Sequence, residues 1–205
     1  KNHREKIIES WTSTIQPEDT VIMAGDLSWA THLPDALNDL KMLSSLPGRK
    51  IIVRGNHDYW WDTVTKMKRM TNNAFEFLHN NALQVNDIAL AGTRGWIPET
   101  SRKFTEDDQK IVLREEGRME RSLQEAKKLN CSKIIAVLHY PPFDENRQPT
   151  HMMQLIASYG VRDVIYGHIH GQQNFHNLPE ELGGVKLHLT SSDYLDFKPL
   201  LIQEW

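Results

Sequence analysis

The five residues Arg54-Gly55-Asn56-His57-Asp58 place an amide, an imidazole and a carboxylate next to one another in the chain. Asn56 offers a neutral oxygen ligand, His57 can carry a proton near neutral pH, and Asp58 can orient that imidazole. Such a trio could bind a metal ion or transfer a proton. An ordinary turn explains the stretch equally well when it is taken alone, because Gly-Asn and His-Asp pairs are common in loops.

The residues before this motif predict where it lies in the fold. Ile51-Ile52-Val53 follow Pro47-Gly48 and form an apolar run that is too short for a helix and rich in β-branched side chains. These features indicate a buried strand. In α/β folds, ligands bind beyond the carboxyl ends of the strands, which is where the motif stands.

Three further apolar runs end in the same way, in a side chain that can bind a metal ion. Residues 20–24 lead into Gly25-Asp26, residues 133–138 into His139, and residues 161–166 into Gly167-His168-Ile169-His170. We therefore expect the ligands to converge at one edge of one sheet: Asp26, Asn56, His139, His168 and His170. Mixed nitrogen and oxygen ligands favour Mn, Fe, Zn or Ni over Ca or Mg.

The joint order of these motifs resembles that of the calcineurin-like metallophosphoesterases. The order is Gly-Asp, Gly-Asn-His-Asp, His and Gly-His-x-His, and it spans most of the chain. The resemblance implies an α/β fold, a four-layer α/β/β/α sandwich of two mixed sheets. It also implies an enzyme that hydrolyses a phosphomonoester or a phosphodiester, with two metal ions and a hydroxide that bridges them.

The resemblance assigns a role to each residue of the motifs. Asp26 would bridge both metal ions. Asn56, His139 and His168 would complete one metal site, and His170 would serve the other. His57, held by Asp58, would stabilise or protonate the reacting phosphoryl group.

Arg94 is a further candidate for the site. It lies in Gly92-Thr93-Arg94-Gly95-Trp96, which follows the apolar run 88–91. Glycines there allow a close approach of the backbone, and the guanidinium could bind phosphate oxygens as a fork. An exposed arginine in a turn explains the same residues equally well.

One motif of the family is missing from the sequence. The family opens with a strand that ends in Asp-x-His, whereas this chain begins Lys1-Asn2-His3-Arg4 and continues into an amphipathic helix with Ile7, Ile8, Trp11 and Ile15 on its apolar side. We therefore expect the sequence to lack its natural start and the first strand of the fold. Without that segment the second metal site keeps only Asp26 and His170.

Two classes of function stay open on these grounds. The first is the metal-dependent hydrolase. The second is a binding or scaffold protein that keeps the same fold but lacks a competent pair of metal ions. The absent Asp-x-His is the one sequence feature that favours the scaffold, and the complete Gly-Asn-His-Asp and Gly-His-x-His motifs favour the enzyme.

Length and charge set outer limits on the function. The 205 residues, 1–205, indicate one domain, and 24 basic against 27 acidic residues give a net charge of −3. This balance argues against a broad nucleic-acid surface but allows a small phosphorylated substrate.

The single Cys131 cannot form an internal disulfide, and no membrane span or signal peptide is visible, so we expect a cytoplasmic protein. The identity of the metal ions and the oligomeric state do not follow from the sequence.

The remaining segments predict the rest of the fold. Helices are expected from the start to residue 15, from Pro34-Asp35 through Leu43, over 62–70, from a capping box at Thr105-x-x-Asp108 to Asn130, and over 151–159. A strand over 75–79 and a hairpin of 83–85 with 88–92 are expected in the second sheet. His176 and His188 are expected in closing strands.

Two aromatic stretches stand beside the predicted site. Trp29 and His32 lie in the loop after Asp26, and Tyr59-Trp60-Trp61 follow the central motif directly. Adjacent tryptophans cannot share one face, so we expect one to pack and one to be exposed. Trp29 and His32 could touch substrate, and an exposed ring of the second stretch could stack on a base or an aryl leaving group. Packing or an ordinary surface position explains each of these residues more simply.

Overall fold

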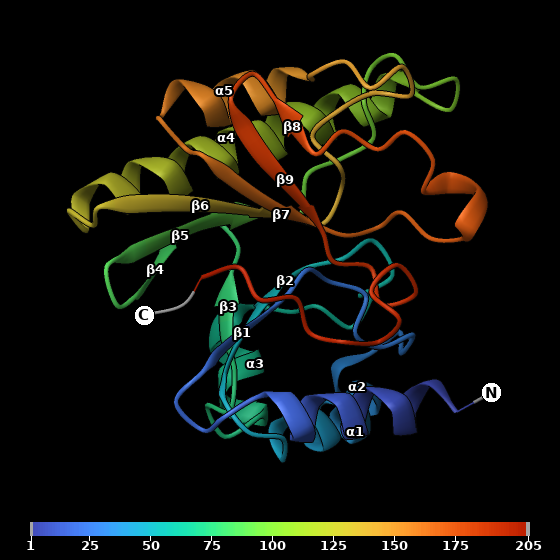
Figure 1. Ribbon diagram of the computed structural model, residues 1–205, viewed down its shortest axis with the longest axis vertical. Helices are drawn as coiled ribbons and strands as arrows, with labels where there is room; N and C mark the ends of the chain where they lie inside the picture. The colour runs from blue at the N-terminus through green and yellow to red at the C-terminus, as the bar shows by residue number, and fades with distance from the viewer. Residues whose placement is uncertain (1, 204–205) are drawn as a thin grey trace.

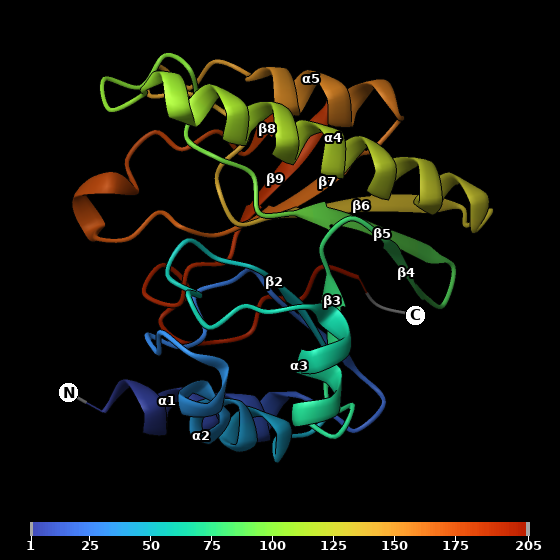
Figure 2. The ribbon, with the colours of Figure 1, turned by 180° about the vertical axis from the view of Figure 1, so that it is seen from behind.

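The computed structural model describes residues 2–203 as two β-sheets packed face to face between two layers of helices (Figure 1). The layers succeed one another along the long axis of the molecule as helix, sheet, sheet and helix, and the view from behind shows the same order (Figure 2). This arrangement confirms the predicted α/β fold and its four layers.

The first sheet has three strands in the order β1-β2-β3, and both pairs are parallel. The strands are β1 (Thr20–Met23), β2 (Arg49–Val53) and β3 (Glu76–Leu78). The helices α1 (His3–Thr14), α2 (Leu33–Ser44) and α3 (Val64–Met70) cover its outer face. Residues 76–78 therefore form a strand as expected, but their assignment to the second sheet was wrong.

The second sheet is mixed and has the strand order β4-β5-β6-β7-β9-β8. Its strands are β4 (Ala82–Val85), β5 (Ile88–Thr93), β6 (Lys133–Leu138), β7 (Asp163–Tyr166), β8 (Glu181–Leu182) and β9 (Val185–Leu189). The expected hairpin about Asn86-Asp87 joins β4 and β5. The helices α4 (Glu106–Lys128) and α5 (His151–Ser158) lie over its outer face.

Three apolar clusters fill the three spaces between the layers. The cluster between the sheets joins buried residues of both, among them Ile51, Val53, Leu90 and Val137. A second packs α4 and α5 on the six-stranded sheet, and a third packs α1, α2 and α3 on the three-stranded sheet. Strands that are buried on both faces read as continuous apolar runs, which is why the four strand-end motifs could be recognised.

The helix α4 begins at the predicted capping box. The backbone N–H of Thr105 donates to the carboxylate of Asp108 over 2.8 Å, and the indole of Trp96 donates to the same side chain over 2.7 Å. These bonds tie the start of α4 to the loop that follows β5. Glu115, in the same helix, is fully buried and accepts a 2.5 Å hydrogen bond from Thr93 at the end of β5.

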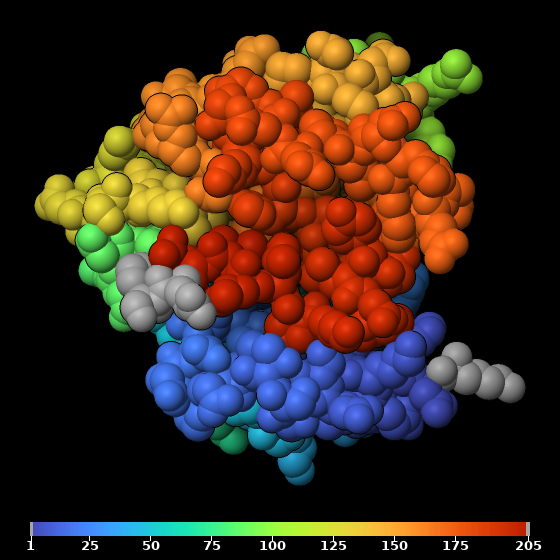
Figure 3. Space-filling view, viewed as in Figure 1, coloured from blue at the N-terminus to red at the C-terminus, as the bar shows by residue number. Residues whose placement is uncertain are grey.

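The segment after β9 runs back across the molecule to α1, and its atoms form the middle of the face seen in Figure 3, above the first helix layer. The ring of Phe197 stacks on His3 of α1 at 4.9 Å, and Lys6 lies 3.7 Å from Asp196. His188 lies in β9 as expected, whereas His176 lies in a turn after the short 3-10 helix Gln172–Asn174. None of the helices within residues 2–203 is long and apolar enough to cross a membrane.

Candidate metal centre

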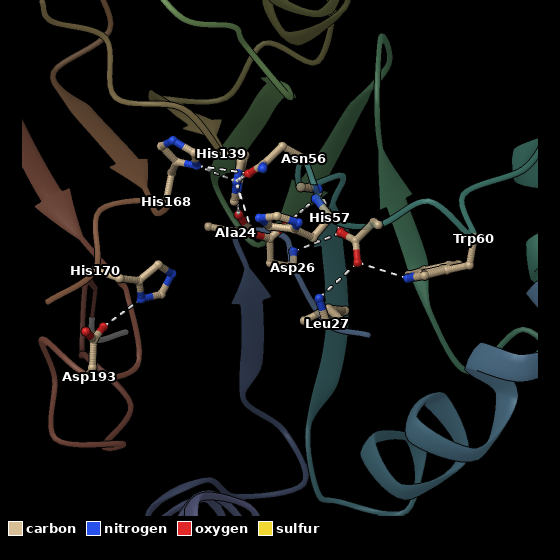
Figure 4. A network of polar contacts seen from close by, with 12 residues as sticks. Ala24, Asp26, Leu27, Asn56, His57, Trp60, His139, His168, His170 and Asp193 are labelled. Atoms are coloured by element: carbon tan, nitrogen blue, oxygen red, sulfur yellow. Dashed lines mark hydrogen bonds and ion pairs between the residues drawn. The ribbon is translucent and has the colours of Figure 1, made fainter. Parts of the chain in front are cut away.

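Four of the five predicted ligands meet where β1, β2, β6 and β7 end (Figure 4). His139 Nε2 lies 2.6 Å from Asn56 Oδ1 and 3.5 Å from Asp26 Oδ2. His168 Nδ1 lies 2.9 Å from the same Asn56 oxygen and 3.2 Å from His139 Nε2. Asp26 and Asn56 come from the first sheet and the two histidines from the second, so the site spans the junction of the sheets. The expectation that the ligands meet at one edge of one sheet was therefore wrong.

The tautomer of His139 is fixed by the backbone after β1. Its Nδ1 lies 2.7 Å from the carbonyl oxygen of Ala24, which can only accept, so the ring donates there and keeps a lone pair on Nε2. Burial lowers the pKa of His139. Burial and then the neighbouring His139 lower the pKa of His168 to about 4. Both imidazoles are therefore neutral at physiological pH, which is the form that binds metal ions.

The backbone at the site is held in unusual conformations. Asp26 and His168 both have positive φ angles, 59° and 70°. Left-handed backbone costs free energy for such residues and persists only where the surroundings impose it. Gly25, with φ of 95°, allows the two sheets to approach, because a Cβ there would lie 2.5 Å from the nitrogen of Gly55 and 2.8 Å from His139 Nδ1.

Asp58 joins the loops that follow β1 and β2. Its buried carboxylate accepts hydrogen bonds from the backbone N–H groups of Asp26 (2.8 Å), Leu27 (2.9 Å) and Gly55 (2.7 Å). It also accepts one from the indole of Trp60 over 2.9 Å. Asp58 is therefore a positioning residue for both loops.

The expectation that Asp58 holds the imidazole of His57 was wrong. The carboxylate oxygens of Asp58 receive four other N–H groups, and His57 Nδ1 is buried without a hydrogen-bond partner among the described residues. The backbone N–H of His57 instead donates to Asp26 Oδ1 over 2.8 Å. This bond fixes the Asp26 carboxylate and leaves the His57 ring held by the aromatic rings of Trp29 and Tyr59.

His170 stands apart from the four converging side chains (Figure 4). Its Nδ1 lies 2.8 Å from Asp193, whose other oxygen accepts the backbone N–H of Gly171 over 2.8 Å. A carboxylate on one ring nitrogen orients an imidazole and leaves the other nitrogen for a ligand. Asp193 was missed in the sequence, although it follows the strand β9 as the other polar residues follow theirs.

Arg94 is buried, so its description as an exposed arginine in a turn was wrong. Its guanidinium lies 3.6 Å from Glu115 and 4.3 Å from the ring centre of Trp96. Its carbonyl oxygen accepts the backbone N–H groups of His139 (3.1 Å) and Tyr140 (3.0 Å). The backbone of Arg94 therefore positions His139, and contact of its side chain with phosphate stays a prediction.

The model of the family described as "Calcineurin-like phosphoesterase" matches residues 3–172. The match covers most of the chain and includes every strand that contributes to the centre. The chain belongs to the calcineurin-like phosphoesterase family. The resemblance seen in the sequence is confirmed, and membership implies, at a general level, metal-dependent hydrolysis of phosphoesters.

Solved structures share the fold of this calcineurin-like phosphoesterase. The protein TT1561 of Thermus thermophilus is 16% identical with a TM-score of 0.62, over 92% of this chain and 82% of that one. AQ665 of Aquifex aeolicus, a protein of unknown function, is 20% identical with a TM-score of 0.52, over 98% of this chain and 81% of that one. At these identities the likeness shows the fold alone. No curated protein matches the chain.

The donor set fits the divalent metal ions that the family binds. Among residues 2–203 no three His, Cys, Asp or Glu side chains form a metal-binding group by themselves. The proposed centre therefore depends on the amide oxygen of Asn56, which lies within 2.9 Å of a ring nitrogen of both His139 and His168. His139 Nε2, which keeps a lone pair, lies 2.6 Å from the acceptor oxygen of Asn56 and 3.5 Å from that of Asp26. A cation would satisfy this excess of acceptors.

Proposed function

We propose that this calcineurin-like phosphoesterase hydrolyses a small phosphorylated substrate, a phosphomonoester or a phosphodiester, at a centre for two metal ions. The observation that carries the proposal is the meeting of Asp26, Asn56, His139 and His168 at four strand ends. When bound, the metal ions supply a Lewis acid that lowers the pKa of water and neutralises the phosphoryl oxygens.

The side chains of this protein would bind the metal ions, supply the proton and contribute positive charge. Asp26, Asn56, His139 and His168 would hold one ion, and His170, oriented by Asp193, would serve the second together with Asp26. His57 would hold the proton that the leaving oxygen takes as the bond to phosphorus breaks. Arg94, beside Glu115, would contribute positive charge behind the site. A cytoplasmic location belongs to the same proposal.

The test separates metal binding from chemistry. His139→Ala should lower the metal content of the purified chain, because His139 donates a lone pair directly to the site. His57→Ala should keep the metal content and lower the rate of hydrolysis by about 10²–10⁴-fold, the range for lost acid–base work. Both are measured as metal per chain and as turnover of a panel of phosphoesters with Mn, Fe, Zn and Ni.

Equal metal loss in the two variants would make His57 a ligand and would contradict its assigned role. A chain that holds metal but turns over no phosphoester under any of the four metals would favour the binding or scaffold protein. The binding or scaffold function is retained as the alternative because His170 lies apart from the other four predicted ligands.

A further inference from the structure

Trp29 is the most exposed of the large apolar side chains in the described part of the chain, with 75% of its surface open to solvent. It lies in the loop after β1, three residues beyond Asp26. Its ring lies against the imidazole of His57 in a tilted arrangement, with 4.3 Å between the ring centres and 36° between the planes. The indole of Trp29 is therefore exposed to solvent and at the same time contacts His57, the residue assigned to proton transfer.

A second exposed ring lies on the same histidine from the other loop. Tyr59, 57% exposed, meets the His57 imidazole edge-on, with 6.1 Å between the ring centres and 85° between the planes. The neighbouring Trp60 is buried and donates to Asp58, and Trp61 packs edge-on against Phe77. The aromatic stretch therefore directs its tryptophans inward and leaves Tyr59 at the surface beside His57.

We propose that Trp29 and Tyr59 form an aromatic platform that binds the leaving group, and that the substrates are phosphoesters of planar aromatic alcohols. The inference rests on the proposed hydrolysis. In that reaction the oxygen of water bonds to phosphorus and the bond from phosphorus to the leaving oxygen breaks. The leaving oxygen keeps the electron pair and takes the proton of His57, and a proton of the water passes to the solvent.

The position of His57 carries the argument. A leaving oxygen within hydrogen-bond distance of its imidazole brings the attached group against whatever flanks that ring, here Trp29 and Tyr59. Flat groups gain most from such a surface, because aromatic rings attract one another in offset-stacked and edge-to-face arrangements. An aliphatic leaving group would gain only the burial of its smaller apolar area.

A cavity of about 220 Å³ near Tyr140 is the competing place for a leaving group. Its lining includes Trp96 and Met152, together with the carboxylates of Glu99, Glu116 and Asp144, and contains neither Trp29, Tyr59 nor His57. The carboxylates disfavour an anionic phosphoester, and the cavity does not touch the proton donor. The platform is therefore the better site.

The experiment compares two esters whose leaving groups have similar acidity but different shape. Phenyl and hexafluoroisopropyl phosphates, each as the monoester and the methyl diester, are hydrolysed by the metal-loaded chain. Trp29→Ala should lower kcat/KM for the phenyl ester by roughly 5- to 100-fold, the range for one lost stacking partner, and leave the hexafluoroisopropyl ester within about 2-fold. Trp29→Phe should keep most of the natural kcat/KM for the phenyl ester, because it retains an aromatic ring.

A binding measurement accompanies the kinetics. Phenylphosphonate should bind more weakly to Trp29→Ala than to the natural chain, whereas methylphosphonate should bind both equally. Leu113→Ala, which removes another exposed apolar side chain from α4, should change none of these quantities. Met152→Ala tests the cavity, and it should also leave the preference for the phenyl ester intact.

Three results would overturn the inference. Equal losses for both esters in Trp29→Ala would mean that the ring only supports His57, and no loss would mean that it touches no substrate. A selective loss for the phenyl ester in Met152→Ala would assign the leaving group to the cavity. In all three cases the proposed hydrolysis is unaffected. A natural chain that cleaves other phosphoesters of the panel but no phenyl ester refutes this inference alone, and a chain that cleaves no phosphoester refutes the proposed function and this inference with it.

Discussion

The carboxylate of Asp58 receives N–H groups from the loops after β1 and β2, and both loops carry a proposed ligand. Asp58→Asn keeps the size of the side chain but turns an N–H₂ group toward these donors. We expect a loss of about 2–4 kcal/mol in the free energy of unfolding, since hydrogen bonds to a buried charge are among the strong ones. The bound metal should fall as well, because Asp26 loses its fixed backbone.

The measurement for Asp58→Asn is a denaturant titration combined with metal per chain. Asp62→Asn is the matched control, because Asp62 lies four residues further on and pairs with Lys66 at the surface. It should leave both quantities unchanged. A stable Asp58→Asn chain that retains its metal would contradict the positioning role of Asp58.

Gly25 carries a second prediction at the residue scale. Gly25→Ala would place a methyl group 2.5 Å from the backbone of Gly55 in a conformation with φ of 95°, so the two loops must separate. We expect a loss of about 3 kcal/mol or more in the free energy of unfolding, from backbone strain and overlap together. Metal binding should be lost, because His139 Nδ1 would lie only 2.8 Å from the new methyl group.

Gly160→Ala separates strain from overlap. Gly160 also has a positive φ, 77°, but a Cβ there would meet no atom within 4 Å. Its substitution should cost only about 1–2 kcal/mol, the cost of left-handed backbone, and should leave the metal content unchanged. Thermal or denaturant unfolding of both variants gives the comparison, and equal losses would contradict the account of Gly25.

At the scale of elements, Glu115 connects α4 to the strand end that carries Arg94. It is fully buried, accepts from Thr93 over 2.5 Å and Arg118 over 2.6 Å, and lies 3.6 Å from Arg94. Glu115→Ala leaves the buried guanidinium of Arg94 without its counter-charge. We expect a loss of about 3–5 kcal/mol in the free energy of unfolding, the range for breaking one side of a buried ion pair.

Glu125→Gln in the same helix is the control for Glu115. Glu125 pairs with Lys128 at the surface, and exposed pairs of this kind contribute little to stability. Denaturant titration should show a large shift of the midpoint for Glu115→Ala and none that can be measured for Glu125→Gln. Similar midpoints for the two variants would refute the proposed role of the buried pair.

Most strands and helices could be predicted because their signals are local. Apolar runs rich in β-branched residues, each leading to a side chain that can bind a metal ion, marked β1, β2, β6 and β7, and the capping box marked the start of α4. The sheet to which residues 76–78 belong could not be predicted in this way. They pair with β2, which lies earlier in the chain, and such a choice of partner depends on packing between layers rather than on the pattern within the strand.

For the whole molecule, the rule that parallel strands present their carboxyl ends at one edge accounts for Asp26 lying beside Asn56 and His139 beside His168. The meeting of the two pairs depends on the packing of the two sheets, which the rule does not predict. The partners that orient them did not follow from any pattern. Asp58 bonds to a loop 32 residues away, and His139 bonds to the carbonyl of Ala24 across 115 positions of sequence. The first contact joins the ends of two neighbouring strands of one sheet, and the second exists because the two sheets pack face to face.

The most direct test of the account is to grow crystals with Mn and locate the ion by anomalous scattering. The account predicts a peak within about 2.0–2.3 Å of donor atoms from Asp26, Asn56, His139 and His168, the usual range for such ligands. A crystal of His139→Ala grown in the same way should lose this peak. Manganese bound elsewhere, with these four side chains apart, would contradict the metal centre and the function proposed from it.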